Sequence, residues 1–142
     1  MGDADDLREA YGRFIAALEA NDADALAAIV SPDIVDHDAL PGQAPGREGV
    51  VRWMRGMHAG LSDLSGVVED TVVEGDKIAS RITWRGTHVG SFLGLPATGK
   101  SVSLGSMHLL RFENGLATDW WGVPDLYGAL TRLGATFELP PA

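Results

Sequence analysis

The chain has 142 residues, of which 45% are hydrophobic and 22% are charged. This length and composition are typical of one globular domain with a real core, so we expect a single domain over residues 1–142. The formal net charge is −9, with eleven basic residues scattered along the chain, which argues against nucleic acid or an anionic membrane as a partner. There are no cysteines, so disulfides, thiolate metal sites and a thiol nucleophile are excluded.

No apolar run approaches the roughly 20 residues that a membrane helix needs. The N-terminal segment 1–11 is acidic and has neither a basic start nor an apolar stretch typical of a secretory signal. We therefore expect a cytoplasmic protein that does not enter a membrane. An uncharged or weakly acidic small molecule is the expected partner.

The first half of the chain is predicted to be helical. Residues 5–19 have apolar positions at helical spacing with acids in the first turn, and Asn21 or Asp22 can cap a short second helix over 22–30. The Pro- and Gly-rich segment 31–46 is expected to be a loop. A third helix is predicted over 47–63, with an apolar stripe formed by Val50, Met54, Met57 and Leu61.

The second half is predicted to be mostly β-strand. Residues 66–90 form two strands joined at 74–76, followed by a turn-rich connection over 91–100, a strand over 101–112 and another over 116–123. A C-terminal helix follows over 124–134, with Asp125 as its N-cap. Alternation predicts that two strands each have one apolar face, composed of Ile78, Ile82 and Trp84 and of Val102, Leu104, His108, Leu110 and Phe112.

Helices followed by a meander of antiparallel strands predict an α+β fold. We expect a strongly curved sheet that wraps on the N-terminal helices, giving a cone with one internal pocket. The sequence leaves the facing of the last strand open. A two-residue Asn114-Gly115 turn would pair His108 with Trp121, whereas a three-residue turn would pair it with Trp120 and place Gly122 on the His108 face.

Histidines are the main candidates for chemistry. His108 lies within an apolar strand face, so it is either a core histidine or a proton-transfer group inside the pocket. His37 lies between two aspartates, which suits proton transfer, although a solvated loop histidine is the alternative. His88 is expected at the pocket mouth or in support of a turn, and His58 on a helix surface. No histidine spacing typical of a metal site occurs, so no metal is expected.

Five segments together resemble one family. They are SPDIVDHD (31–38), GREGVVRWM (46–54), GTHVGSFLGLPATGK (86–100), HLLRFENG (108–115) and WWGVPDLYGALTRLG (120–134). In this order they resemble the SnoaL-like polyketide cyclases, small enzymes with a nuclear-transport-factor-2-like cone fold. The resemblance covers most of residues 7–134.

The resemblance implies ring closure by intramolecular aldol chemistry on a polyketide ester, without metal or organic cofactor. It also implies that Gly122 occupies the position of the family's proposed general acid/base, an aspartate three residues before the terminal Asp125. His108 matches the family's strand histidine, His88 its loop histidine, and Trp53 the helix position that influences stereochemistry. Because the family places its acid and histidine around one pocket, the resemblance favours the three-residue turn.

The leading hypothesis is therefore a cofactor-independent enzyme that moves protons on a polyketide-like or aromatic small molecule. Its expected catalytic residues are His108 and His37, with Asp125 second in rank. The residues expected to bind substrate are Trp53, Met57, Trp84, His88, Trp120, Gly122 and Phe14. The alternatives are a hydrolase, isomerase or hydroxylase on the same fold, a protein that binds a hydrophobic molecule without catalysis, or a scaffold.

An exposed sheet face with Trp121, Met107 and Leu109 is expected to be either covered by helices or available as an interface. A homodimer or homotetramer is the assembly that such an interface would give.

Overall fold

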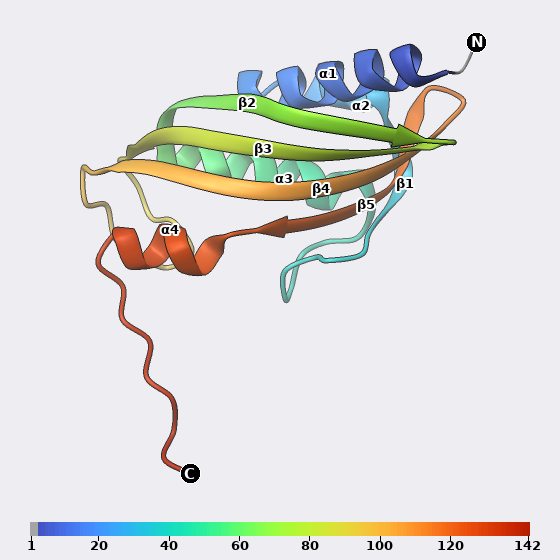
Figure 1. Cartoon of the computed structure of the whole chain (residues 1–142). Coiled ribbons are helices and arrows are strands. Elements are labelled where there is room, and N and C mark those ends of the chain that lie inside the picture. The colour runs from blue at the N-terminus through green and yellow to red at the C-terminus, as the bar shows by residue number, and fades with distance from the viewer. Residues whose placement is uncertain (1–2) are drawn as a thin grey trace.

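The computed structural model describes residues 3–142 and contains a helical layer packed against one curved sheet (Figure 1). Helix α1 (Ala4–Ala20) and the short α2 (Ala23–Ile29) open the chain, α3 (Gly46–Gly60) follows, and α4 (Leu126–Arg132) comes near the end. Asp3, Asp22 and Asp125 cap α1, α2 and α4 with their carboxylates, because these oxygens can accept the unpaired N–H groups of a first helical turn. Beyond α4 the chain has no regular secondary structure and extends away from the sheet (Figure 1).

The sheet has five strands in the order β1-β5-β4-β3-β2. Their bounds are β1 Val30–Asp36, β2 Leu61–Glu74, β3 Lys77–His88, β4 Ser101–Glu113 and β5 Leu116–Pro124. The four strands β2 to β5 pair antiparallel, and β1 runs parallel to β5 at the edge. The α+β class and the curved sheet on N-terminal helices are thus confirmed.

The core lies between the inner face of the sheet and the helices. The apolar positions predicted to share a face on β3 and on β4 are all buried, and the alternate positions of β4 are mostly exposed. Strand side chains alternate between the two faces, so this burial pattern fixes His108 on the inner face. From the helical side, Tyr11 and Phe14 of α1 and Met54 of α3 complete the core.

The segment 30–36 was predicted as the end of a helix followed by a loop, and this prediction is wrong. It is strand β1, whose pairing with β5 is irregular between Val30 and Val35. Pro32 lies within the unpaired stretch. A proline cannot donate a ladder hydrogen bond and is tolerated only at a sheet edge or irregularity, so the residue that suggested a loop is compatible with this strand.

The β4–β5 hairpin determines which side chains of β5 face the core. The turn is the two-residue Asn114-Gly115, both with positive φ (52° and 78°), as the mirror-image turn of a tight hairpin requires. The three-residue turn favoured by the resemblance is wrong. However, the register shifts after Phe112–Ala117, so that Thr118 is an extra residue and Arg111 pairs with Asp119. This bulge reverses the facing. His108 therefore lies directly opposite Gly122, and Trp120 and Gly122 face inward.

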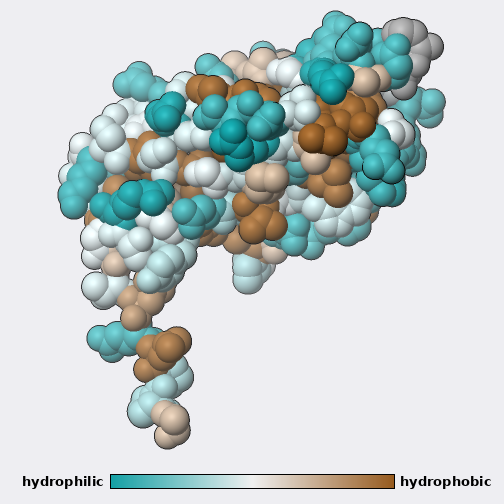
Figure 2. Space-filling view, in the orientation of Figure 1, coloured by the Kyte–Doolittle hydropathy of each residue, from teal (hydrophilic) through white to brown (hydrophobic). Residues whose placement is uncertain are grey.

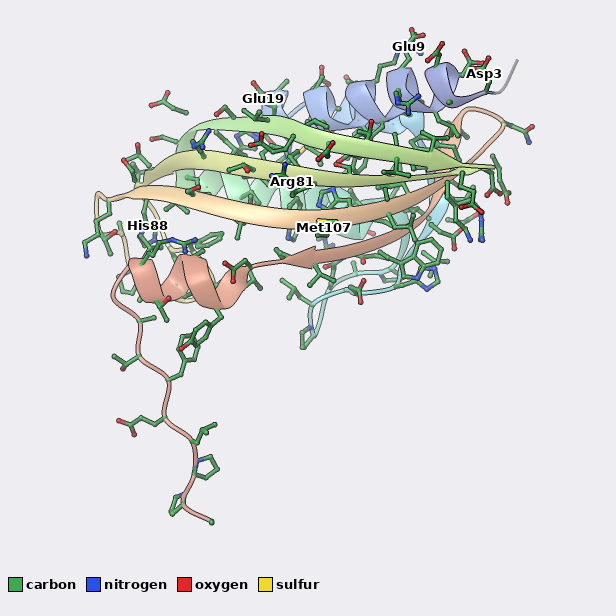
Figure 3. All side chains as sticks on the ribbon, viewed as in Figure 1. Asp3, Glu9, Glu19, Arg81, His88 and Met107 are labelled. Atoms are coloured by element: carbon green, nitrogen blue, oxygen red, sulfur yellow. The ribbon has the colours of Figure 1, made fainter. Side chains whose placement is uncertain are left out.

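The outer face of the sheet is only partly polar. Figure 2 shows apolar patches interspersed with hydrophilic side chains on the face turned to the viewer. Arg81 and Met107 pair across β3 and β4 and point out from this face (Figure 3). Met107 is exposed, and so is Val123, its partner on β5. Helices do not cover Met107, so a homodimer or homotetramer through this face stays a prediction. Within residues 3–142, no helix combines the length and apolar character needed to span a bilayer.

Candidate active site

A pocket with a cavity volume of about 100 Å³ opens on the inner side of the sheet. The side chains around it come from β4, β5, α3, the start of α4 and the segments 36–43 and 92–93. Its apolar wall includes Trp53, Met57, Phe92, Leu104, Trp120 and Leu126, and its polar groups include Asp36, Asp38, Gln43, Ser106 and His108. An apolar chamber with few polar groups is the usual form of a small-molecule site.

His108 is the titratable group inside this chamber. Its side chain is buried, and this burial lowers the pKa of the imidazole from 6.5 to about 4, because a charged ring would lose its hydration. Its Nδ1 lies 3.3 Å from the hydroxyl oxygen of Tyr11. Among the described residues, the one side-chain hydrogen bond of the His108 ring is at Nδ1, and none is formed at Nε2. At neutral pH His108 is therefore an uncharged imidazole whose second nitrogen is available to a ligand.

Tyr11 connects His108 to Ser80. The Tyr11 hydroxyl lies 2.6 Å from the Ser80 Oγ, and burial raises the pKa of Tyr11 to about 12, so it stays a phenol. If Nδ1 donates to Tyr11, Tyr11 donates to Ser80 and Nε2 is a proton acceptor. If Tyr11 donates to Nδ1 instead, Nε2 carries the proton and is a donor. The hydroxyl chain can thus support both proton states of the pocket nitrogen.

The indole of Trp120 packs beside Gly122. A side chain at Gly122 would begin 2.9 Å from the Trp120 Nε1 and 3.6 Å from the Cδ2 of His108. The first of these distances is shorter than ordinary carbon contacts, so the indole edge lies in the space that a side chain at 122 would use. Edge-on contacts with Phe14, Trp53 and His108, at centroid distances of 5.5, 5.6 and 5.4 Å, hold the Trp120 ring there. The bulge turns Trp120 inward, and the glycine at position 122 leaves room for its indole edge.

Two carboxylates lie at the pocket mouth. Asp38 Oδ2 accepts a hydrogen bond from the Gly122 N–H at 3.0 Å, which fixes this acid beside the last strand. Asp36 accepts from the Gln43 side chain at 2.8 Å and from the Asp38 N–H at 3.1 Å. Asp38 was not among the residues predicted to act on a substrate. It lies in the turn that directly follows β1, and the hydrogen bond from its N–H to Asp36 holds the two acids close together.

His37 lies outside the pocket. Its ring stacks on Trp121 at a centroid distance of 4.2 Å, and its Nε2 donates to Asp119 Oδ1 at 2.9 Å. That hydrogen bond, together with Thr118 and Arg111, holds the pKa of Asp119 below its usual value. The structure does not bring His37 and His108 together, because β1 turns His37 toward the outer face. Through its contacts with Asp119 and Trp121, His37 connects the end of β1 to β5.

Asp125 and His88 have structural partners. Asp125 Oδ1 accepts the Gly128 N–H at 2.9 Å, so its carboxylate caps α4, and Asp125 does not line the pocket. His88 is fully buried. Its Nδ1 accepts the Thr98 N–H at 3.2 Å, and its Nε2 donates to the Leu95 carbonyl at 3.2 Å. His88 thus supports the turn-rich segment after β3, one of the two alternatives that the sequence left open.

The residues expected to bind substrate divide into two groups. Trp53, Met57, Trp120 and Gly122 line the pocket. Phe14 and Trp84 are buried in the core behind it and do not line it; Phe14 supports Trp120, and the Trp84 ring packs under Gly66. Tyr11, the partner of His108, and Ser80, the partner of Tyr11, were also missed, since nothing in the sequence relates Tyr11 to positions 97 and 69 residues away.

Within residues 3–142, no group of three His, Cys, Asp or Glu side chains is placed to hold a metal ion. The residues that meet at the pocket are instead a neutral imidazole, an indole and carboxylates in an apolar wall. Such a set can accept and return a proton and can hold an aromatic ring.

A curved sheet that closes over helices around one lined pocket defines a cone-shaped α+β protein with a small-molecule chamber. The family model of the SnoaL-like polyketide cyclases matches residues 8–133. The chain belongs to this family.

Two curated relatives carry names that state a reaction. The aklanonic acid methyl ester cyclase DnrD of Streptomyces peucetius is 33% identical over 66 residues, which cover 46% of this chain and 46% of that protein. The nogalonic acid methyl ester cyclase of Streptomyces nogalater is 31% identical over 86 residues, covering 60% of this chain and 62% of that protein. The matched part of the chain thus spans about half the length of these relatives.

Solved structures match over nearly the whole chain. TsrD from Streptomyces laurentii superposes with a TM-score of 0.87 at 33% identity, covering 94% of this chain and 98% of that one. AclR from Streptomyces galilaeus, described as a candidate hydroxylase, gives 0.81 at 29% identity, covering 97% and 91%. The relatives therefore share one fold under names that state different reactions, and the reaction has to be argued from the pocket.

Proposed function

We propose that this protein is a cofactor-independent enzyme that closes a ring on a polyketide-like or aromatic small molecule, with His108 as its proton-transfer group. The observation that carries the proposal is the position of His108: a buried neutral imidazole, held at Nδ1 by Tyr11, with Nε2 unpartnered in an apolar pocket. A neutral imidazole is a base that can become an acid once it has taken a proton.

The proposed ring closure removes one proton from the substrate and returns one to the product. Nε2 of His108 takes the proton from a carbon next to a carbonyl group, and the electron pair of that C–H bond forms an enolate. The enolate carbon attacks a second carbonyl carbon of the same molecule and forms the ring bond. The resulting alkoxide takes the proton back from the imidazolium, so the product has the mass of the substrate. The Tyr11–Ser80 pair supports the change in proton state at the opposite nitrogen.

Asp38 is our candidate for the carboxylate of this site. The family resemblance assigns the acid position to Gly122, and the Asp38 carboxylate reaches that strand position from the turn after β1 by accepting the Gly122 N–H. Asp38 also lines the pocket. We propose that its negative charge stabilises the imidazolium formed during the reaction, because an opposite charge nearby favours the protonated ring.

The test is incubation with the methyl esters of aklanonic and nogalonic acids, the compounds that name the two cyclase relatives. The reaction is run in deuterated buffer and followed by chromatography and mass spectrometry. We expect a new product that has gained no atoms other than exchanged deuterium, or at least deuterium uptake next to a carbonyl group above the buffer rate. Unchanged esters without such uptake, despite measured binding, would contradict the proposed catalysis.

Binding without catalysis is the second candidate function. The observation that favours it is the Trp120 indole in the place where the resemblance puts an acid, since an indole N–H can donate a hydrogen bond to an oxygen but does not act as an acid or base at neutral pH. Quenching of tryptophan fluorescence by these esters, with no product and no exchange, would support a binding protein.

A further inference from the structure

The indole nitrogen of Trp120 is a buried donor without a partner. Trp120 is 5% exposed, and among the described residues no acceptor lies within hydrogen-bond distance of its Nε1. A buried N–H group that lacks an acceptor costs about 1–3 kcal/mol, so structures seldom retain one without a reason.

The position of this nitrogen gives the reason. Nε1 lies 2.9 Å from the point where a side chain at Gly122 would begin, and the Cδ2 of His108 lies 3.6 Å from the same point. His108, Trp120 and Gly122 all line the pocket. The indole N–H and the edge of the imidazole therefore lie close together beside Gly122 at the pocket wall.

Trp84 provides an internal comparison. Its Nε1 is also buried and has no partner among the described residues. Its ring, however, packs under Gly66, where a side chain would begin 2.7 Å from the ring, and Trp84 does not line the pocket. Of these two unpartnered indoles, Trp120 is the one that lines the pocket.

The groups around Trp120 Nε1 restrict which kind of ligand atom can bind there. An indole N–H only donates, so its partner must be an acceptor. His108 is neutral at physiological pH, and Asp36 and Asp38 lie at the same pocket, which disfavours a ligand that is already an anion. A neutral carbonyl oxygen on a flat, apolar molecule meets both conditions. The aromatic rings of Trp53 and Trp120 suit the rest of such a molecule.

We propose that Trp120 Nε1–H, which lies beside Gly122, forms a binding site for one carbonyl oxygen of the ligand, next to His108. The inference rests on the proposed function, whose pocket it uses. In the ground state the site orients a ketone, quinone or ester carbonyl. When His108 takes the neighbouring proton, the indole N–H stabilises the charge that develops on that oxygen, as fixed donors do in other enzymes. A neutral donor thus stands beside the strand position that the resemblance assigns to an acid.

The test uses 1-indanone and indane, two bicyclic probes that differ by one carbonyl oxygen. Dissociation constants are measured for the unmodified protein, for Trp120→Phe and for the matched control Trp84→Phe, which removes the other unpartnered indole N–H. One neutral hydrogen bond corresponds to roughly a two- to tenfold change in affinity. We expect the preference for 1-indanone over indane to fall by this factor in Trp120→Phe and to remain in Trp84→Phe.

An NMR measurement on the unmodified protein keeps the test independent of variant folding. The indole ¹⁵N–¹H signal that is missing in Trp120→Phe should shift on addition of 1-indanone and much less on addition of indane. Equal binding of both probes, or a preference that survives Trp120→Phe, would overturn the carbonyl site and leave the proposed enzyme intact. Failure of both probes to bind at millimolar concentration would count against the ligand pocket itself, and so against both proposals.

Discussion

Replacing His108 with glutamine should lower turnover of the true substrate by roughly 10²–10⁴-fold, the usual contribution of a general acid or base. Glutamine is polar and can still form a hydrogen bond with Tyr11, but it cannot accept a proton at neutral pH. Because the pocket and its aromatic wall stay in place, ligand affinity should change much less than kcat. Steady-state kinetics of both proteins, with ligand affinity from tryptophan fluorescence, measure this separation.

The matched control is His37→Gln, the same substitution at the histidine that lies outside the pocket. His37 contacts Trp121 and Asp119 rather than the chamber, so its loss should reduce turnover by clearly less than the general acid–base factor. Equal losses in the two variants would contradict the assignment of His108. So would a His108→Gln protein that retains full activity.

The stability of the protein should depend on pH through His108. Burial lowers the pKa of the folded-state imidazole to about 4 from 6.5. Between these values the unfolded chain binds the proton and the folded chain does not, so acid favours unfolding. The free energy of unfolding should therefore be highest above about pH 6.5 and should fall by about 3 kcal/mol as the pH drops to about 4.

Urea unfolding at several pH values, for the unmodified protein and for His108→Gln, isolates this contribution. The lowered pKa of Asp119 also makes acid destabilising, but that group is present in both proteins and cancels in their difference. The curve of the variant should be flatter by the expected amount between pH 4 and 6.5. Parallel curves would mean that His108 has the same proton affinity in the folded and unfolded chains.

Sequence patterns correctly predicted the features that depend on residues close together in the chain. Alternation placed Leu104, His108 and Leu110 on one face of β4, because a strand that covers a core must be apolar on one side. Asp125 was expected as a helix cap before its carboxylate was seen to accept the Gly128 N–H. The fold class follows from the order of these elements.

The missed features depend on contacts that are distant in sequence. Segment 30–36 becomes a strand because β5 is available beside it, and its few paired residues and Pro32 conceal this in the sequence. The bulge at Thr118 is equally hidden, because the Asn114-Gly115 turn alone indicates the opposite facing. These two features turn His37 out of the pocket and place Asp38 at its mouth.

The relation between Trp120 and Gly122 was only half predictable. Gly122 was expected to bind substrate on the His108 face, but the indole edge of Trp120 fills much of the space beside it. The reason is steric: two positions separated by one residue project to the same face, and only a glycine at the second lets a large ring lie along the strand.

The most direct test of the account is the titration of the His108 imidazole by NMR in ¹⁵N-labelled protein, assigned by comparison with His108→Gln. The account predicts a ring that remains neutral from pH 8 down to pH 5, with protonation beginning only as the pH approaches 4. A titration midpoint near 6.5 or above would show an imidazole in contact with bulk water. That result would contradict a proton-transfer group buried in an apolar pocket.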